Sequence, residues 1–168
     1  MLKKMYDLQK KKGKKGFSMI ELIIVIAIMA ILMALIGTQL IPYLEKSRAR
    51  KDQNTMDACL TNLESAIAES EYNGGAASWN GIASLPSTPS DVKGEYETFA
   101  GDAYDTDAEL TAVLKSKEAK GATVTFGINS EGVCYVQAIA TGNEHGGLIV
   151  SSKFSGYVDD MPNGFSLN

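Results

Sequence analysis

Residues 22–44 read LIIVIAIMAILMALIGTQLIPYL, a run of 23 residues without a charged side chain. An α-helix rises about 1.5 Å per residue, so such a run can cross the hydrocarbon layer of a bilayer, which is about 30 Å thick. A cleaved secretory signal has a shorter apolar core that is followed by a small-residue cleavage site. This run is too long and ends without such a site, so it predicts a helix that spans a membrane.

Charge is distributed unevenly around this apolar run. Residues 1–16 hold seven lysines and one acidic residue, whereas the whole chain has a net charge of −4. By the positive-inside rule the basic segment stays in the cytoplasm, and the C-terminal part is expected outside. A smaller basic cluster after the span opposes this orientation and consists of Lys46, Arg48, Arg50 and Lys51. Because the basic charge lies in a tail and the remainder is acidic, the sequence disfavours nucleic-acid binding.

An amphipathic pattern continues the helix beyond the apolar run. Met56, Leu60, Leu63 and Ile67 recur at intervals of four, three and four, as on one face of a helix. Gln53 and Ala49 extend this stripe backward. The opposite face is expected to hold Lys51, Asp52, Asn62, Glu69 and Ser70. Gly74 and Gly75 supply a stop, so one helix is predicted over residues 17–73. A small domain cannot enclose so long a helix, so its first half must be embedded in a membrane or an assembly.

Pro42 falls inside this predicted helix. Proline lacks the N–H that a helix interior uses, and its ring clashes with the preceding turn. Gly37, five residues earlier, adds backbone freedom. We therefore expect a kink or local melting between Gly37 and Pro42.

The rest of the chain predicts an α+β fold. Residues 74–105 are rich in Gly, Ala, Ser, Pro and Asp and are expected to form a long connecting loop. Thr106 and Glu109 make a capping-box pattern that predicts a short helix over residues 107–118. Alternating apolar residues predict three antiparallel strands, at 124–128, 133–140 and 148–154, followed by an irregular tail. One apolar face of this small sheet can cover the stripe on the helix.

The sequence GFSMIELIIVIAIMAIL, residues 16–32, resembles the class III signal of type IV prepilins. The resemblance implies that a dedicated membrane peptidase cuts after Gly16 on the cytoplasmic side and methylates the new N-terminal amine of Phe17. It also implies the type IV pilin fold, a long N-terminal helix packed on a small antiparallel sheet. Members of this family often carry a proline about one turn nearer the helix start than Pro42, so the position of any melted segment is left open.

Glu21 is the one ionisable residue near the start of the apolar helix, and it is the fifth residue of the chain that would begin at Phe17. An ionised carboxylate in a membrane segment costs several kcal/mol and normally faces a partner. The amine that cleavage frees on Phe17 of a neighbouring subunit would be such a partner. The pair would favour one axial register in an assembly. The alternative is that Glu21 is stabilised at the helix start by the macrodipole.

The resemblance divides the chain into a cleaved leader, a filament-core helix and an extracellular head. The leader covers residues 1–16, and the span covers 17–44. The head begins at residue 45, and its expected parts are helix 45–73, the αβ-loop region 74–121, sheet 122–158 and tail 159–168.

The remaining chemically active residues do not form a recognisable catalytic or metal site. Cys59 and Cys134 are the only cysteines, and a disulfide or two separate buried thiols both fit the sequence. His145 is the only histidine and is expected in a turn, so no His triad or multi-histidine metal site is available. Four acidic residues could suggest calcium but lack the EF-hand spacing, and they are Asp102, Asp105, Asp107 and Glu109. Asp159 and Asp160 could also contribute carboxylates to an ion site. For both groups the favoured interpretation is solvation and stabilisation of a helix N-terminus. No enzyme activity, cofactor or metal is predicted.

Aromatic residues gather in the long connecting region, and they are Trp79, Tyr96, Phe99 and Tyr104. Such residues either form an adhesive surface or tie a loop to its domain. The sequence favours the second role.

The resemblance to type IV prepilins implies a structural protein that polymerises with itself into a surface filament through its N-terminal helix. A head-to-tail contact that does not close into a ring generates a helical fibre from one subunit. The implied partners are the prepilin peptidase and methyltransferase, the membrane, minor pilins and, indirectly, an assembly platform with its ATPase. The expected location is the cytoplasmic membrane for the single-pass precursor and then a filament on the bacterial surface.

The task of the filament is left open among adhesion, motility, aggregation and DNA uptake. A major pilin is favoured. A minor pilin or pseudopilin of a secretion or competence machine is the alternative within the family. A surface binding protein anchored by an uncleaved helix is the alternative from another class.

Overall fold

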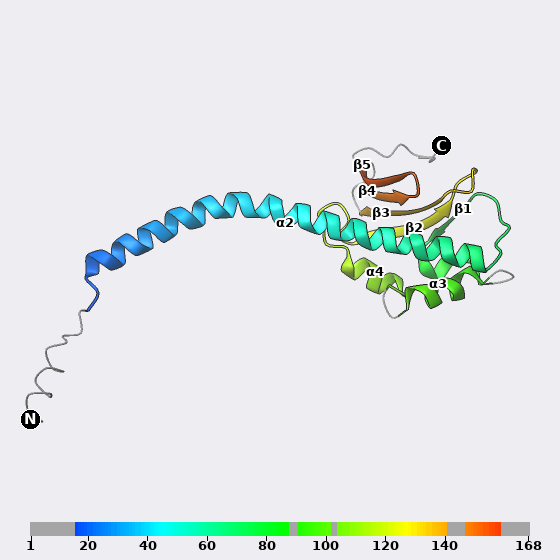
Figure 1. Cartoon of the computed structure of the whole chain (residues 1–168), viewed down its shortest axis with the longest axis horizontal. Coiled ribbons are helices and arrows are strands. Elements are labelled where there is room, and N and C mark those ends of the chain that lie inside the picture. Colours follow the sequence, from blue (N-terminus) through cyan, green and yellow to red (C-terminus); the bar gives the residue numbers. More distant parts are fainter. Residues whose placement is uncertain (1–15, 88–90, 102–103, 141–146, 159–168) are drawn as a thin grey trace, which may run out of the picture. The chain divides into compact units, whose positions relative to one another are not determined.

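The computed structural model describes residues 16–87, 91–101, 104–140 and 147–158 (Figure 1). The chain divides into two compact units, Met1–Pro42 and Tyr43–Asn168. The first unit contributes the apolar part of a helix, and the second contains the rest of that helix, the sheet and the shorter helices.

The long helix α2 covers Met19–Glu69 and contains 51 residues. It begins two residues later than predicted because Ser18 and Glu21 form a capping box at its start. It ends four residues earlier than predicted, because Glu71 adopts a left-handed conformation with φ of 51° and the Tyr72 N–H donates to the Ile67 carbonyl. This is a Schellman closure, which ends the helix before Gly74 is reached.

Helix α2 runs through Gly37 and Pro42 without leaving the helical conformation. Pro42 is fully inside the element. The expected local melting is therefore wrong for this structure, because the helix is unbroken there. A kink at this position stays a prediction.

A five-stranded antiparallel sheet follows, with strand order β1-β2-β3-β4-β5. The strands are β1 Ala77–Asn80, β2 Ala122–Ile128, β3 Cys134–Ala140, β4 Gly147–Ser151 and β5 Phe154–Val158. The α+β architecture of a long helix on a small antiparallel sheet is therefore confirmed. The prediction of three strands was wrong, because the two edge strands are short and lie in Gly- and Ser-containing sequence. The predicted strand 148–154 is divided by a turn at residues 152–153 into β4 and β5.

The predicted connecting loop contains regular structure. Besides β1, it holds a short 3-10 helix, η1 Ile82–Ser84, and helix α3 Val92–Ala100. Helix α4 covers Asp107–Val113 and begins with the predicted cap, in which the Glu109 N–H donates to Thr106 Oγ1 over 3.3 Å. It is five residues shorter than predicted.

The core lies between the second half of α2 and one face of the sheet (Figure 1). The register places Phe126 opposite Val136 and Val136 opposite Val150, so these buried side chains form one continuous apolar face. The helix contributes the predicted stripe residues Met56, Leu60 and Leu63, all of which are buried. Tyr96 of α3 closes the core with its ring edge-on to Phe126. One residue contradicts the predicted stripe: Asp52, placed on the solvent face by sequence, is completely buried.

Candidate functional site

The start of α2 carries a self-contained polar cap. The Ser18 N–H donates to Glu21 Oε2 over 2.8 Å, and the Ile20 N–H donates to Ser18 Oγ over 3.3 Å. Together these bonds satisfy N–H groups that a helix start leaves unpaired, and the carboxylate lies at the positive end of the helix dipole. Within a single chain, Glu21 therefore has a local partner. This agrees with the alternative that Glu21 is stabilised at the start of the helix.

Among the described residues, the side chains next to this cap are apolar and uncovered. Phe17 is 94% exposed. The side chains that line a shallow hollow together with Glu21 are Phe17, Leu22, Ile24 and Val25. A single carboxylate in such an environment is a position where an added positive charge would bind strongly once water is excluded.

The apolar run forms an unburied helix surface over its whole length. Every described residue from 16 to 44 is exposed. Helix α2 is also long and apolar enough to cross a membrane, and none of its most apolar window is buried inside the chain. Exposed apolar surface of this extent on a folded chain marks a membrane or protein contact.

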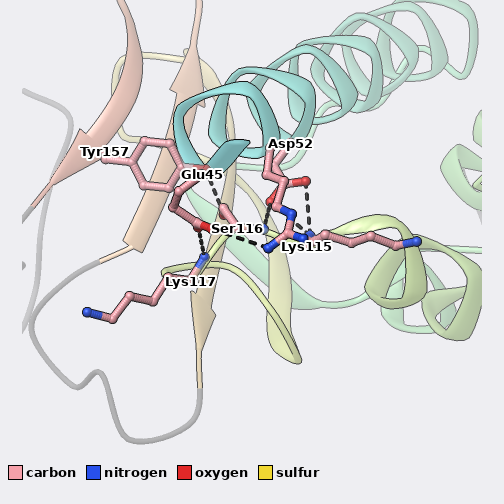
Figure 2. A network of polar contacts seen from close by, with 7 residues as sticks. Glu45, Asp52, Lys115, Ser116, Lys117 and Tyr157 are labelled. Carbon is pink, nitrogen blue, oxygen red and sulfur yellow. Dashed lines mark hydrogen bonds and ion pairs between the residues drawn. The ribbon is translucent and has the colours of Figure 1, made fainter. Parts of the chain in front are cut away.

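The head holds the next turns of α2 through a polar clamp, made by Glu45, Asp52 and Tyr157 against residues 115–117 (Figure 2). Asp52 accepts the Lys115 N–H with both carboxylate oxygens, at 3.1 and 3.0 Å. It also accepts the Ser116 N–H at 2.7 Å. The buried charge is thus stabilised by backbone donors that follow α4.

Two further contacts extend the clamp along the helix. Glu45 accepts the Lys117 N–H. Tyr157 of β5 donates its hydroxyl to the Ala49 carbonyl over 3.2 Å and lies 2.9 Å from Ser116 Oγ. Burial raises the pKa of Tyr157 to about 12, so this hydroxyl keeps its proton and remains a donor at neutral pH.

Sequence reasoning missed the clamp because it counted Asp52 with the polar face. Asp52 lies four residues before Met56, which in a helix places both on one face. That spacing was the signal that could have identified Asp52 as a buried residue. Its partners, the N–H groups of Lys115 and Ser116, belong to the backbone and leave no trace in residue type.

Both cysteines are buried free thiols. This agrees with the alternative of two separate apolar side chains and not with a bridge in this structure. Burial raises the pKa of Cys59 and of Cys134 to about 11. The thiols therefore stay protonated and react slowly near neutral pH.

Three of the acidic residues considered for calcium, Asp105, Asp107 and Glu109, belong to the described part of the chain. No cluster of three or more metal-ligating side chains occurs among the described residues. Asp107 instead accepts the Ile82 N–H over 2.6 Å and so caps η1. Asp102, His145, Asp159 and Asp160 lie outside the described residues.

Most aromatic residues of the connecting region pack into the head. Tyr96 is fully buried, and Trp79 and Tyr104 are partly buried against the core. Phe99 alone of the four is exposed, at 46%. The role of these residues in attaching the region to its domain is thus confirmed for three of them.

Comparison with known proteins finds relatives for both the helix start and the head. Residues 11–37 match the prokaryotic N-terminal methylation motif. Two fimbrial proteins of Pseudomonas aeruginosa are each 32% identical to the chain over 129 residues, covering 73% of this chain and 84% of the relative. The chain belongs to the type IV pilin family. Because the aligned region is far longer than the motif, the likeness to these pilins includes the head. No solved structure shows a significant match.

The motif match covers the predicted processing residues of this pilin. Gly16, Phe17 and Glu21 all lie inside residues 11–37. The family is one of structural filament proteins and not of enzymes. In this pilin the structure brings Glu21 and Phe17 to one shallow hollow, whereas the clamp on Asp52 belongs to the head.

Proposed function

We propose that this pilin is the structural subunit of a type IV pilus, processed between Gly16 and Phe17 and methylated on the Phe17 amine. The single observation that carries the proposal is the uncovered apolar surface of residues 22–44, attached to a head with its own closed core. Such a surface needs an apolar environment outside the chain. A bilayer provides it before assembly, and the helices of neighbouring subunits provide it afterwards.

Moving this helix from lipid into a filament core exchanges one apolar environment for another. The hydrophobic effect therefore contributes little to the exchange, and specific contacts must decide the register. The polar group available for that purpose is Glu21. Before cleavage it accepts the Ser18 N–H; after cleavage the new amine of a neighbouring Phe17 would offer a full positive charge instead.

The proposed partners follow from this cycle. They are further copies of the chain, the prepilin peptidase with its methyltransferase activity, and the cytoplasmic membrane that holds the precursor. Minor pilins and an assembly platform driven by an ATPase would act at assembly. The pilin itself would have no catalytic role, and its filament would serve adhesion, motility, aggregation or DNA uptake.

Intact mass and N-terminal sequencing of sheared surface material test the proposal. We expect a mature chain that begins with Phe17 and carries one additional methyl group. A filament protein that retains residues 1–16 would contradict processing. A chain that retains them and is found only in the membrane would support an uncleaved anchor instead.

Gly16→Val provides the matched variant for the processing step. A peptidase must bring the scissile backbone close, and a branched side chain at this position obstructs that approach. We expect the precursor to accumulate in the membrane without sheared filaments. Normal trimming of this variant to Phe17 would contradict the proposed cleavage site.

A further inference from the structure

A set of exposed cations surrounds α2 directly after the apolar run. We call this set the basic collar; it consists of Lys46, Arg48, Arg50 and Lys51, all of which are exposed. Of these four cations, only Arg48 makes an ion pair with a described residue, Glu45, over 3.5 Å. The other three present their full charge to whatever surrounds the helix.

The clamp engages both acidic residues of the segment 45–52. Its two acidic residues, Glu45 and Asp52, turn toward the head, where they accept backbone N–H groups of residues 115–117. Lys46, Arg50 and Lys51 stay exposed and unpaired with the clamp, while Arg48 remains beside Glu45. The collar is therefore a positive surface on a chain whose net charge is −4.

The collar lies at the depth of lipid headgroups when residues 22–44 span a bilayer. By helix rise, Lys46 to Lys51 follow Leu44 by about 3 to 10 Å, and one headgroup layer is about 5 to 8 Å thick. Long cationic side chains also reach along a helix to keep their charge at this level. Tyr43, which is 71% exposed, precedes the collar as an amphipathic ring of the kind found at membrane interfaces.

Four cations on this side of the span oppose the orientation set by the lysines of residues 1–16. A contact between these cations and negative groups on the outer side would offset their unfavourable effect on the orientation. We propose that the basic collar binds anionic lipid headgroups of the outer leaflet while the pilin is stored in the cytoplasmic membrane. This inference rests on the proposed membrane storage. The cations would then lose their contact with lipid phosphate when the subunit leaves the bilayer.

Energy transfer between the full chain and labelled lipid tests this contact. A donor fluorophore is attached to Ser47→Cys, which lies exposed inside the collar, whereas Cys59 and Cys134 are buried and protonated and resist labelling. The chain is reconstituted at low density in phosphatidylcholine vesicles. Two vesicle preparations are compared. One contains a trace of phosphatidylglycerol with an acceptor fluorophore on its acyl chain, and the other contains the same amount of phosphatidylcholine with the same label.

We expect about fivefold enrichment of phosphatidylglycerol over phosphatidylcholine near the donor, since one cation near a membrane surface contributes roughly that factor. The enrichment should disappear in the triple variant K46Q/R50Q/K51Q. It should also be strongly reduced at 500 mM salt, where the Debye length is only about 4 Å. The control variant K93Q/K120Q/K153Q removes the same charge from the head and should keep the enrichment.

Equal energy transfer to both lipids, or equal loss in both triple variants, would overturn the collar proposal. A donor response that appears only as protein density rises would assign the collar to a second copy of the chain and would also overturn it. Flotation with the vesicles is measured in parallel. A chain that does not float contradicts membrane storage itself, whereas a chain that floats without lipid preference contradicts only the collar.

Discussion

The two halves of helix α2 belong to one continuous element and have opposite surroundings. Residues 19–44 are entirely exposed although nearly all are apolar, whereas the second half is buried on one face although it contains many polar residues. The first half has more hydrophobic surface than the chain can cover. The second half has a stripe that the sheet covers and a clamp that holds Asp52.

This difference separates two kinds of stability in one helix. Burial and hydrogen bonding within the chain stabilise the second half, so its mutations should change the free energy of unfolding of the head. The environment outside the chain must stabilise the first half, so its mutations should change membrane storage and assembly. Four predictions test whether these effects are as separate as the structure indicates.

The largest effect is expected at Glu21. Glu21→Ala should abolish or severely reduce filaments, because a neighbouring Phe17 amine would be left as a desolvated charge without a partner. Membrane insertion should be retained, since the span becomes more apolar. The measurement compares mature membrane protein with sheared filaments in the same cells.

Glu21→Gln supplies the matched control, because it keeps the shape and an acceptor oxygen but removes the charge. It should assemble as poorly as the alanine variant if ion pairing decides the register. Normal filament yield from both variants would rule out charge pairing. Normal yield from Glu21→Gln alone would indicate that hydrogen bonding at the helix cap is sufficient.

Asp52 should be the most sensitive polar residue of the head. Asp52→Ala leaves the N–H groups of Lys115 and Ser116, the second of them buried, without their acceptor, at a cost of roughly 3 kcal/mol in the free energy of unfolding. Asp52→Asn should cost less, because one acceptor oxygen remains. Chemical denaturation of detergent-solubilised protein measures both, with exposed Glu64→Gln as a control that should change little.

Alkaline pH should destabilise the head through Cys59. Burial raises the pKa of this thiol from 9.0 to about 11, so the unfolded chain releases a proton that the folded chain retains. The stabilising contribution is therefore complete below about pH 9 and is lost as pH rises toward 11, by about 2 kcal/mol. Denaturation curves between pH 7 and 11 test this, and Cys59→Ala should flatten the pH dependence while lowering stability at pH 7. An unchanged slope in that variant would assign the effect to other groups.

The smallest effect is expected at Tyr157. Tyr157→Phe removes the hydroxyl that reaches Ala49 and Ser116 but keeps the ring, so the free energy of unfolding should fall by about 1 kcal/mol. Filament yield should be unchanged. A strong loss of filaments from this variant, with a stable head, would mean that the clamp also acts in assembly and that the two halves of the helix are not separate.

Sequence reasoning was most successful where a pattern is local and repeated. The apolar run, the stripe through Met56, Leu60 and Leu63, and the Thr106 cap each depend on residues close together in the chain. It was least successful for β1 and β5, which are short edge strands stabilised by pairing with β2 and β4. A four-residue strand has too little periodicity of its own to be recognised.

The sequence by itself determined that this chain has an apolar helix joined to an acidic head, and it carried the signature of the family in residues 11–37. Composition and spacing suffice for these features because they express local preference and the transfer of side chains from water. Only the tertiary structure decided that Asp52 is buried and that the acidic residues beside the collar face inward. Those placements depend on backbone N–H groups more than 60 residues away, which every residue except proline possesses and no residue type reveals.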